Sequence, residues 1–537
     1  MPTSYLSFPQ TNYFSKLICD YLDQKQELKP FYNRFPHLEN FADQLKEKKE
    51  SFTQENRKVL SSVLQRQYQG FQTSSATIAN ITALEDEDTF TVVTGHQLNL
   101  FTGPLYFLYK IVSTINLCKE LQQQHPNNCF VPVYWMASED HDFEEINFFN
   151  FNGKKFQWQG PGTNQQGGMV GAYPTEGLDC VLELFSSELG KGIQAQALVD
   201  LFHNAYIEHD NLADATRYIV NQLFSEQGLV ILDASDKALK RLFIPHMRQE
   251  LFESTSQNTV EETISELNNV DSSYKIQVNP RAINLFYLQT GKRERIIETE
   301  NGFGVNNTDI IWSHQELEEH LTNYPERFSP NVMTRPLYQE VILPNLCYIG
   351  GGGEIAYWLE LKGFFDSQKV PFPMLLLRNS ALIISEKQSN KLEKLNISDK
   401  QLFLDKNSFI NSKIREISNI DIDFSKQKKH LTEQFQEMYK IAEQTDKTFL
   451  GAVKAQEIKQ LRGLDRLEKR LLKAQKKKLS DQVLRLTALQ NELFPNGSLQ
   501  ERTDNFSNLY VQYGPLFIKL LLEELDPLRA EFVLIRI

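Results

Sequence analysis

Two polar segments, each directly after a short apolar run, carry the side chains best suited to chemistry. The first is Thr94-Gly95-His96-Gln97-Leu98-Asn99, which follows the β-branched run 89–94. A glycine lets the backbone approach a ligand closely, and the side chains of His96 and Gln97 can donate hydrogen bonds to phosphate oxygens. We therefore expect Thr94, Gly95, His96, Gln97 and Asn99 to bind a nucleotide or phosphate group. The alternative is a tight turn whose polar pair is satisfied internally.

The second polar segment, Ser138-Glu139-Asp140-His141-Asp142, follows the apolar run 130–137. Four ionisable groups at a strand end are costly unless they are solvated, paired or used. Carboxylates there can take a proton from an amine or hold magnesium, so we expect Glu139, Asp140, His141 and Asp142 to be catalytic. An acidic helix N-terminus is the alternative. A metal hydrolase is disfavoured because no second histidine cluster is evident.

Two further segments are candidates for contact with substrate. Four glycines at 350–353 precede Glu354, but the run matches neither GxxxxGK[ST] nor GxGxxG with its acidic spacing. We expect Gly351 and Gly352 to approach a nucleotide and Glu354 to contact substrate, unless the glycines only form a turn that packs a helix on the sheet. Arg335, with Gln339 four residues on, can clamp a carboxylate by two hydrogen bonds, or form a structural salt bridge.

A parallel sheet is needed to bring these segments together. The strand-like runs 89–94 and 130–137 flank a helical pattern over 105–121, which is a βαβ unit. Further buried strands are expected at 228–233, 346–349 and 373–378. Ligands of such sheets bind beyond the carboxyl ends of the strands, where the candidate residues lie.

The rest of the chain divides by pattern. We expect an N-terminal helical segment (1–85), a catalytic core (86–424) with insertions at about 150–215 and 250–330, a helical arm (425–490) and a C-terminal return to the core (491–537). An inserted loop or hairpin region is expected within 150–180, a helix near 205–227, a strand at 281–290, a turn-rich stretch at 328–336, and a closing helix and strand within 508–537. In the arm, apolar residues recur at three- and four-residue steps, with a slip between Leu471 and Leu479.

Composition excludes several classes of protein. The chain has 537 residues, a net charge of −12 and five cysteines, none in a CxxC pair, so we expect no structural zinc and no disulfide framework. An acidic chain is a poor general binder of nucleic acid. The basic run from Lys454 to Lys478 is best explained as a solvated helix face, with binding of phosphates or of an acidic surface of the same protein as the alternatives. We see no signal peptide and no apolar run of about 18 residues, so we expect a cytoplasmic protein without a membrane partner.

Four segments together resemble the BshC family, the cysteine-adding enzyme of bacillithiol biosynthesis. They are VTGHQLNLFTGPLYFLYK (93–110), VPVYWMASEDHDFEEIN (131–147), SPNVMTRPLYQE (329–340) and LCYIGGGGEIAYWLELK (346–362). The resemblance implies an α/β fold with a Rossmann-like parallel-sheet core, similar to class I aminoacyl-tRNA synthetases, with inserted connecting segments and a long α-helical coiled-coil arm. Gly95-His96-Gln97 stands where those synthetases have their His-rich signature, and Arg378 and Asn379, after the last strand, stand nearest to the second signature by position.

The resemblance further implies an amide-forming ligase that adds L-cysteine to glucosaminyl-malate. Because a carboxylate is unreactive toward an amine, we expect ATP with Mg²⁺ to activate it. Asp140 or His141 would then deprotonate the amine, and Arg335 would clamp a carboxylate. Another ligase or nucleotidyl transferase with a different amine acceptor is one alternative, and a non-catalytic scaffold is another. The apolar stripe of the arm predicts a homodimer.

Overall fold

The computed structural model describes residues 3–160 and 167–537, which form two compact units. The core unit contains the residues up to Pro9, Tyr13–Ile383 and Gln500–Ile535. The arm unit contains Gln10–Asn12, Ile384–Leu499 and Arg536–Ile537. Among the described residues, no helix is long and apolar enough to cross a membrane.

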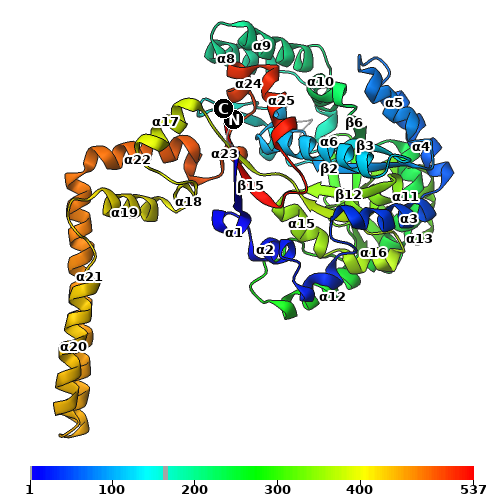
Figure 1. The fold of residues 1–537 in the computed structure, drawn as a ribbon. Coiled ribbons are helices and arrows are strands. Elements are labelled where there is room, and N and C mark those ends of the chain that lie inside the picture. The colour runs from blue at the N-terminus through cyan, green and yellow to red at the C-terminus, as the bar shows by residue number, and fades with distance from the viewer. Residues whose placement is uncertain (1–2, 161–166) are drawn as a thin grey trace. The chain divides into compact units, whose positions relative to one another are not determined.

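A parallel five-stranded sheet forms the centre of the core unit, in the order β13-β12-β2-β3-β6 (Figure 1). Its strands and the crossover helix α6 confirm the predicted βαβ unit. Their bounds are β2 Thr89–His96, α6 Tyr106–Gln124, β3 Cys129–Met136, β6 Val230–Asp233, β12 Asn345–Gly350 and β13 Met374–Leu377. β2 is two residues longer than predicted, because Gly95 and His96 continue the pairing with β3. The strand order reverses between β2 and β12, and such a switch point opens a crevice at the carboxyl ends.

The N-terminal segment is mostly helical, as predicted. Side chains of Ser15, Thr53 and Ser74 accept hydrogen bonds from backbone N–H groups at the starts of α2, α4 and α5, which fixes where these helices begin. The elements are β1 Thr3–Ser7, α1 Phe8–Thr11, α2 Lys16–Leu22, α3 Phe41–Ser51, α4 Gln54–Gln67 and α5 Ser75–Ala83. The strand β1 was not predicted.

The first insertion holds the predicted hairpin and the helix predicted near 205–227. The hairpin is β4 Phe148–Phe151 with β5 Lys154–Gln157, and the helices are α7 Phe143–Ile146, α8 Leu178–Leu189, α9 Ile193–Tyr206 and α10 Leu212–Phe224. Residues 161–166 of the expected hairpin region lie outside the described residues. Phe149, Phe185 and Phe202 pack with Phe101 into an aromatic cluster that anchors the insertion.

The second insertion is an antiparallel five-stranded sheet, ordered β10-β9-β8-β7-β11, of which only the strand near 281–290 was predicted. Its strands are β7 Leu285–Gln289, β8 Lys292–Thr299, β9 Gly302–Val305, β10 Ile311–Trp312 and β11 Phe328–Pro330. The helices around it and after it are α11 Lys237–Glu253, α12 Thr255–Val270, α13 His314–Asn323, α14 Thr334–Ile342, α15 Gly352–Leu359 and α16 Lys362–Gln368. The expected turn-rich stretch at 328–336 contains β11 and the start of α14.

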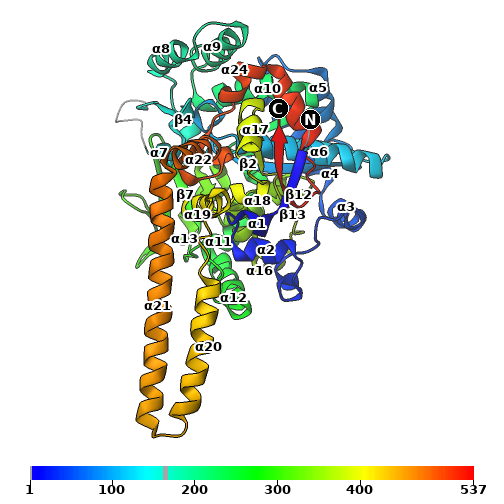
Figure 2. The ribbon, with the colours of Figure 1, turned by 60° about the vertical axis from the view of Figure 1, so that its left-hand side comes forward.

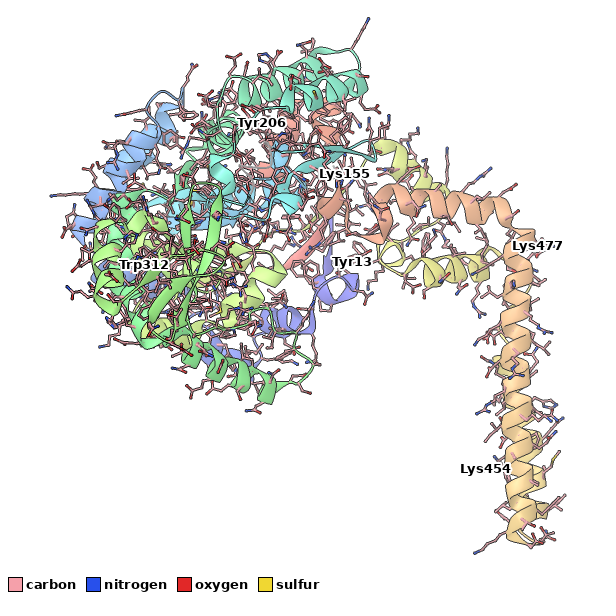
Figure 3. The ribbon with its side chains drawn as sticks, turned by 180° about the vertical axis from the view of Figure 1, so that it is seen from behind. Tyr13, Lys155, Tyr206, Trp312, Lys454 and Lys477 are labelled. Carbon is pink, nitrogen blue, oxygen red and sulfur yellow. The ribbon has the colours of Figure 1, made fainter. Side chains whose placement is uncertain are left out.

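The arm unit is helical, and α20 and α21 run side by side in opposite directions (Figure 2). Its helices are α17 Glu386–Lys394, α18 Asp399–Leu402, α19 Lys406–Ile417, α20 Ser425–Ala442, α21 Lys447–Lys478 and α22 Ser480–Leu493. The slip in the apolar spacing falls where α21 ends and α22 begins. Lys454 and Lys477 of the basic run are exposed on α21 (Figure 3).

The chain then returns to the core unit with α23 Gln500–Thr503, α24 Ser507–Tyr513, α25 Pro515–Glu524 and β15 Glu531–Arg536. The predicted closing helix and strand are therefore present. A three-stranded sheet has the order β1-β15-β14, with β14 at Ala381–Ile384, so the two ends of the chain pair with each other.

Candidate active site at the carboxyl ends of the parallel strands

A cavity of about 670 Å³ lies beyond the carboxyl ends of β2 and β3. Its lining includes the ends of these strands, the segment before β7, the strand β8 and the first residues of α14. Of the predicted site residues, it gathers Gly95, His96, Gln97, Glu139, Asp140, His141, Asp142, Arg335 and Glu354. The volume falls in the range typical of small-molecule sites.

The three carboxylates after β3 have different surroundings. Glu139 forms an ion pair of 2.7 Å with the buried Lys240 and accepts a hydrogen bond of 3.0 Å from Ser329. Asp140 accepts hydrogen bonds of 2.8 Å from the Gln97 amide and from the backbone N–H of His141. Asp142 is exposed and has no side-chain hydrogen-bond partner among the described residues.

The pKa of Asp140 lies below its ordinary value. Burial of this carboxyl raises its pKa, but the hydrogen bonds from the Gln97 amide and the backbone N–H of His141, together with the charge of Arg293, outweigh that effect. A carboxylate that accepts several hydrogen bonds stays ionised. Asp140 is therefore a permanent negative charge in the cavity and a weak proton acceptor.

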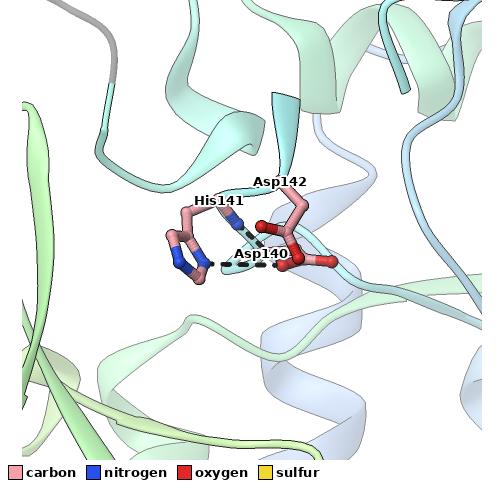
Figure 4. A group of neighbouring side chains, drawn as sticks. All are labelled: Asp140, His141 and Asp142. Carbon is pink, nitrogen blue, oxygen red and sulfur yellow. Dashed lines mark hydrogen bonds and ion pairs between the residues drawn. The ribbon is translucent and has the colours of Figure 1, made fainter. Parts of the chain in front are cut away.

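His141 lies between Asp140 and an arginine of the second insertion. Its ring Nδ1 is 3.7 Å from Oδ1 of Asp140 (Figure 4) and 2.9 Å from Nη1 of Arg293. Only the shorter distance is that of a hydrogen bond. Arg293 also donates to the Ser329 hydroxyl and stacks on Phe286, with its guanidinium carbon 4.0 Å from the ring centre.

Asp140, His141 and Asp142 bring potential metal-ligand atoms within 4.8 Å of one another. The guanidinium of Arg293 is hydrogen-bonded to Nδ1 of His141, and its positive charge opposes a second cation. These residues therefore do not fit a resident metal ion in this arrangement.

The loop after β2 contributes His96 and Gln97. His96 is buried, its Nε2 has no hydrogen-bond partner in the described part of the chain, and burial together with the charge of Lys110 lowers its pKa well below the ordinary value. The imidazole is therefore neutral. The Gln97 amide donates to Asp140 and Glu145 and thereby ties the loop after β2 to the loop after β3.

An ion pair between the buried Lys110 and the half-buried Glu354 forms part of the cavity lining. Lys110 of α6 lies 2.6 Å from Glu354 and donates to the backbone oxygen of Gly95. Glu354 also accepts hydrogen bonds from the Tyr348 hydroxyl and the backbone N–H of Gly351. Burial raises the pKa of Glu354, but the charge of Lys110 lowers it by more than burial raises it. Glu354 is therefore ionised.

Arg335 is half-buried beside this pair. It donates to Oε1 of Gln339 and to the hydroxyl of Tyr357, and lies over the rings of Trp135 and Tyr348. These contacts hold the guanidinium rigidly at the cavity wall. Its remaining N–H groups are the part available to a ligand.

Seven predicted site residues are not part of the cavity lining. Thr94 donates to the backbone of Ile349, and Asn99 lines a smaller neighbouring pocket. Gln339 is fully buried against Arg335. Gly351 lies close to Glu354 and Arg378, and Gly352 faces Ile18 and Phe14, so the glycine run packs α15. Arg378 forms a buried ion pair of 2.8 Å with Glu501.

Asn379, next to Arg378, is also remote from the cavity. It bonds Ser113 and the backbone of Asp526. Arg378 and Asn379, which were candidates by their position after the last strand, thus contact the C-terminal return to the core.

Four cationic side chains of the cavity were missed by sequence reasoning. They are Lys110, Arg281, Arg293 and Arg295. Arg293 and Arg295 lie two residues apart on β8, and this spacing was the available signal that both point to one face. Arg281 and Arg295 are exposed, without hydrogen-bond or ion-pair partners for their side chains among the residues described.

A parallel sheet with a ligand-sized cavity at its switch point defines a Rossmann-like α/β protein. The model of the bacillithiol biosynthesis BshC N-terminal Rossmann-like domain matches residues 1–379, and that of the BshC C-terminal coiled-coil domain matches residues 381–537. The chain belongs to the bacillithiol biosynthesis BshC family.

Relatives in this family span the whole chain. A protein of Christiangramia forsetii is 60% identical over 532 residues, covering 99% of this chain and 98% of its own. One of Flavobacterium johnsoniae is 56% identical over 537 residues, covering 100% of both. Each is named "Putative cysteine ligase BshC".

One solved structure, titled a putative arginyl-tRNA synthetase of Campylobacter jejuni, aligns with 84% of this chain and 98% of its own. The identity is 13% and the TM-score 0.21. A likeness at this level carries no argument, so the specific similarity to class I synthetases stays a prediction, while the Rossmann-like sheet and the helical arm are confirmed.

Proposed function

We propose that this protein is the ligase that joins the carboxyl group of L-cysteine to the glucosamine amine of glucosaminyl-malate, which forms bacillithiol. The family and the names of its relatives support this proposal. The observation that carries it is the cavity lining, where the carboxylates of Asp140 and Asp142 occur together with the unpaired guanidinium groups of Arg281 and Arg295. Such a lining suits a ligand that has both an amine and carboxylates.

The amine would bind at the loop after β3. Asp140 stays ionised and attracts the ammonium group. Asp142 is an accessible carboxylate without a side-chain partner among the described residues, so we assign it the proton that the ammonium group must lose before its nitrogen can attack the carbonyl carbon. The nitrogen loses its second proton to solvent as the activating group leaves that carbon with its electron pair.

The malate carboxylates would bind Arg281 and Arg295, whose guanidinium groups are free for bidentate contacts. Arg335 was the candidate from the sequence. Its place in the cavity keeps it a candidate for the cysteine carboxyl, although two of its N–H groups are already used.

ATP with Mg²⁺ is the proposed source of activation. His96 carries a buried Nε2 in the cavity lining that has no hydrogen-bond partner among the described residues, which fits one phosphoryl oxygen. When bound, ATP supplies the energy that converts the cysteine carboxylate into an acylating group. His96 and Gln97 would then hold the phosphoryl end, and no protein ligand is assigned to the magnesium ion.

The proposed reaction takes place in the cytoplasm. All five cysteines are free thiols, which suits a reducing compartment.

The test is incubation of the pure protein with cysteine and glucosaminyl-malate, with and without Mg-ATP, followed by mass spectrometry. Formation of bacillithiol only with ATP is the expected result. Product with another amine from a panel, and none with glucosaminyl-malate, would show a different acceptor. Absence of turnover together with co-purification of pathway enzymes would contradict a ligase and favour a scaffold.

A further inference from the structure

Arg293 reaches the candidate site from β8, 152 residues after His141 in the sequence. Its Nη1 lies 2.9 Å from Nδ1 of His141, its Nε donates to the Ser329 hydroxyl at 3.2 Å, and its Nη2 donates to the Pro330 carbonyl at 3.2 Å. The Phe286 ring lies beneath the guanidinium and also contacts the His141 ring. All three nitrogens of the Arg293 guanidinium therefore have a hydrogen-bond partner.

This geometry decides which ring nitrogen of His141 carries a proton. A guanidinium group has five N–H donors, no acceptor and a permanent charge. Nδ1 of His141 can lie at hydrogen-bond distance from it only as an acceptor, with its lone pair toward Nη1. The proton of the neutral imidazole is then on Nε2, and the 3.7 Å contact between Nδ1 and Asp140 is not a hydrogen bond.

A doubly protonated His141 would place two cations and two facing N–H groups together. The charges around the ring come from Glu139, Asp140 and Asp142 on the loop after β3 and from Arg293 and Arg295 on β8. Glu139 is already paired with Lys240, and Asp140 accepts from the backbone N–H of His141 and from the side-chain amide of Gln97. These two carboxylates therefore have partners without a second proton on His141, and Asp142 is exposed to solvent.

A second layer holds Arg293 in place. The Ser329 hydroxyl accepts from Arg293 and donates to Glu139, and Glu139 pairs with the fully buried Lys240. Lys240 also donates to the backbone oxygen of Phe328. This chain of contacts joins β11, β8, α11 and the loop after β3, so the guanidinium cannot turn away without breaking several hydrogen bonds.

We propose that Arg293 fixes His141 as the neutral tautomer protonated at Nε2, so that His141 serves the cavity as a hydrogen-bond donor and not as a proton acceptor. Nε2 has no partner in the described part of the chain, and His141 lines the cavity. The group it suits is an oxygen that gains negative charge, such as that of a carboxyl group under attack by an amine. This catalytic assignment rests on the proposed function, whereas the tautomer does not.

Nuclear magnetic resonance of the full-length protein tests the tautomer directly. Long-range ¹H–¹⁵N correlations of ¹⁵N-histidine-labelled protein distinguish protonated from unprotonated ring nitrogens, and loss of signals in His141→Gln assigns the ring. We expect an unprotonated Nδ1 and a protonated Nε2. A protonated Nδ1 in the unchanged protein would overturn the proposal, and this measurement needs no folded variant.

Two matched variants test the cause. Arg293→Met removes the donor, and Arg295→Met removes the neighbouring arginine of the same strand, which also faces Phe286 at 6.0 Å. We expect Arg293→Met to shift the His141 nitrogens toward exchange between tautomers or toward protonation, and Arg295→Met to leave them unchanged. Unchanged shifts in a folded Arg293→Met protein would show that the arginine does not set the tautomer.

The catalytic part is tested in the ligase assay. Loss of one oxyanion donor typically lowers turnover about 100-fold, so we expect this loss in His141→Ala and substantial rescue in His141→Gln, whose amide can donate. Equal losses in both variants would contradict the donor role. If no ligase activity is found for the unchanged protein, the proposed function fails while the spectra still decide the tautomer.

Discussion

Adjacent residues of one loop have distinct roles because the fold gives each a different partner. Glu139 is neutralised by a buried lysine, Asp140 is hydrogen-bonded and ionised, and Asp142 is accessible. The sequence showed only four ionisable groups in a row. Their different environments come from Lys240, Gln97 and Arg293, which are distant from this loop in the sequence.

The carboxylates can be told apart by substitution. We expect Asp142→Asn to lower turnover by about 100-fold or more, because general base catalysis typically contributes 10²–10⁴-fold. Asp140→Asn removes the charge that attracts the ammonium group, so its main effect should be a higher KM. Steady-state kinetics with varied glucosaminyl-malate measures both, and full activity of Asp142→Asn would exclude it as the base.

The ion pair of buried Lys110 with half-buried Glu354 makes a stability prediction. Breaking a fully buried pair by removing one partner typically costs about 3 kcal/mol, and because the Glu354 side chain is 26% exposed, we expect Lys110→Met to cost less than this. Urea-induced unfolding, followed by circular dichroism, measures the loss. The control is the double variant Lys110→Met, Glu354→Gln, which should regain part of it, whereas additive losses would show that the pair is not coupled.

The site was predictable from sequence only in part. Residues directly after β2 and β3 could be placed together because the carboxyl ends of parallel strands share one edge. Arg281, Arg293 and Lys240 could not, since no motif marks them and they approach from the second insertion and its flanking helix. The glycine run suggested a ligand-binding loop. Close approach of a ligand and close packing of α15 both require small residues, so the sequence does not distinguish them.

Elements of the two sheets differed in how far their sequences revealed them. The parallel strands are buried on both faces, so they stand out as continuous apolar runs. β8 reads KRERIIET and is largely exposed, so its composition hides the strand. β1 was missed because its pairing partner β15 lies at the other end of the chain.

A buried carboxyl at the end of α15 ties that helix to the segment before β7. Glu360 accepts hydrogen bonds from the backbone N–H groups of Gln277 and Val278, and burial raises its pKa from 4.5 to about 7. The segment it holds leads to Arg281 and Asn284 of the cavity. Glu360 therefore links protonation to the position of the cavity wall.

The sign of the resulting pH dependence follows from linkage. The folded state binds the Glu360 proton more tightly than the unfolded state, so the free energy of unfolding should fall as pH rises from about 4.5 to 7, by about 3 kcal/mol. Glu360→Gln cannot titrate and should lack this part of the slope. Unfolding in urea at pH 5 and pH 8 measures it.

Burial raises the pKa of Asp504 to about 6, so Asp504 adds to the pH dependence of unfolding in both the unchanged protein and Glu360→Gln. The test is therefore the difference between the pH profiles of these two proteins. Parallel pH profiles for the unchanged protein and Glu360→Gln would contradict the role of Glu360.

At the scale of the whole molecule, the arm exposes apolar side chains that one helix pair cannot cover. Met438, Ile441, Phe449, Ile458 and Leu467 are all exposed on α20 and α21, while Phe435, Ala442 and Val453 form the small cluster between the helices. We propose that a second copy covers the exposed residues, which gives a homodimer.

Association through the arm is testable by light scattering. We expect the full chain to have the mass of a dimer and the variant Ile441→Glu, Ile458→Glu, Leu467→Glu to be monomeric, because charges replace apolar contacts. Lys454→Glu, an exposed change on the same helix, controls for altered charge. A dimer mass that persists in the triple variant, and after removal of residues 425–490, would refute association through the arm.

The pairing of β1 with β15 has a consequence for how the protein is made. Thr3 pairs with Ile535 and Ser7 with Glu531, so β1 has no pairing partner until β15 has been synthesised. The sheet that joins β1 and β15 must therefore form later than the parallel sheet, whose strands all precede β15 in the chain. A nascent chain stalled before residue 531 should protect β2 and β3 from protease and leave the first residues open to cleavage.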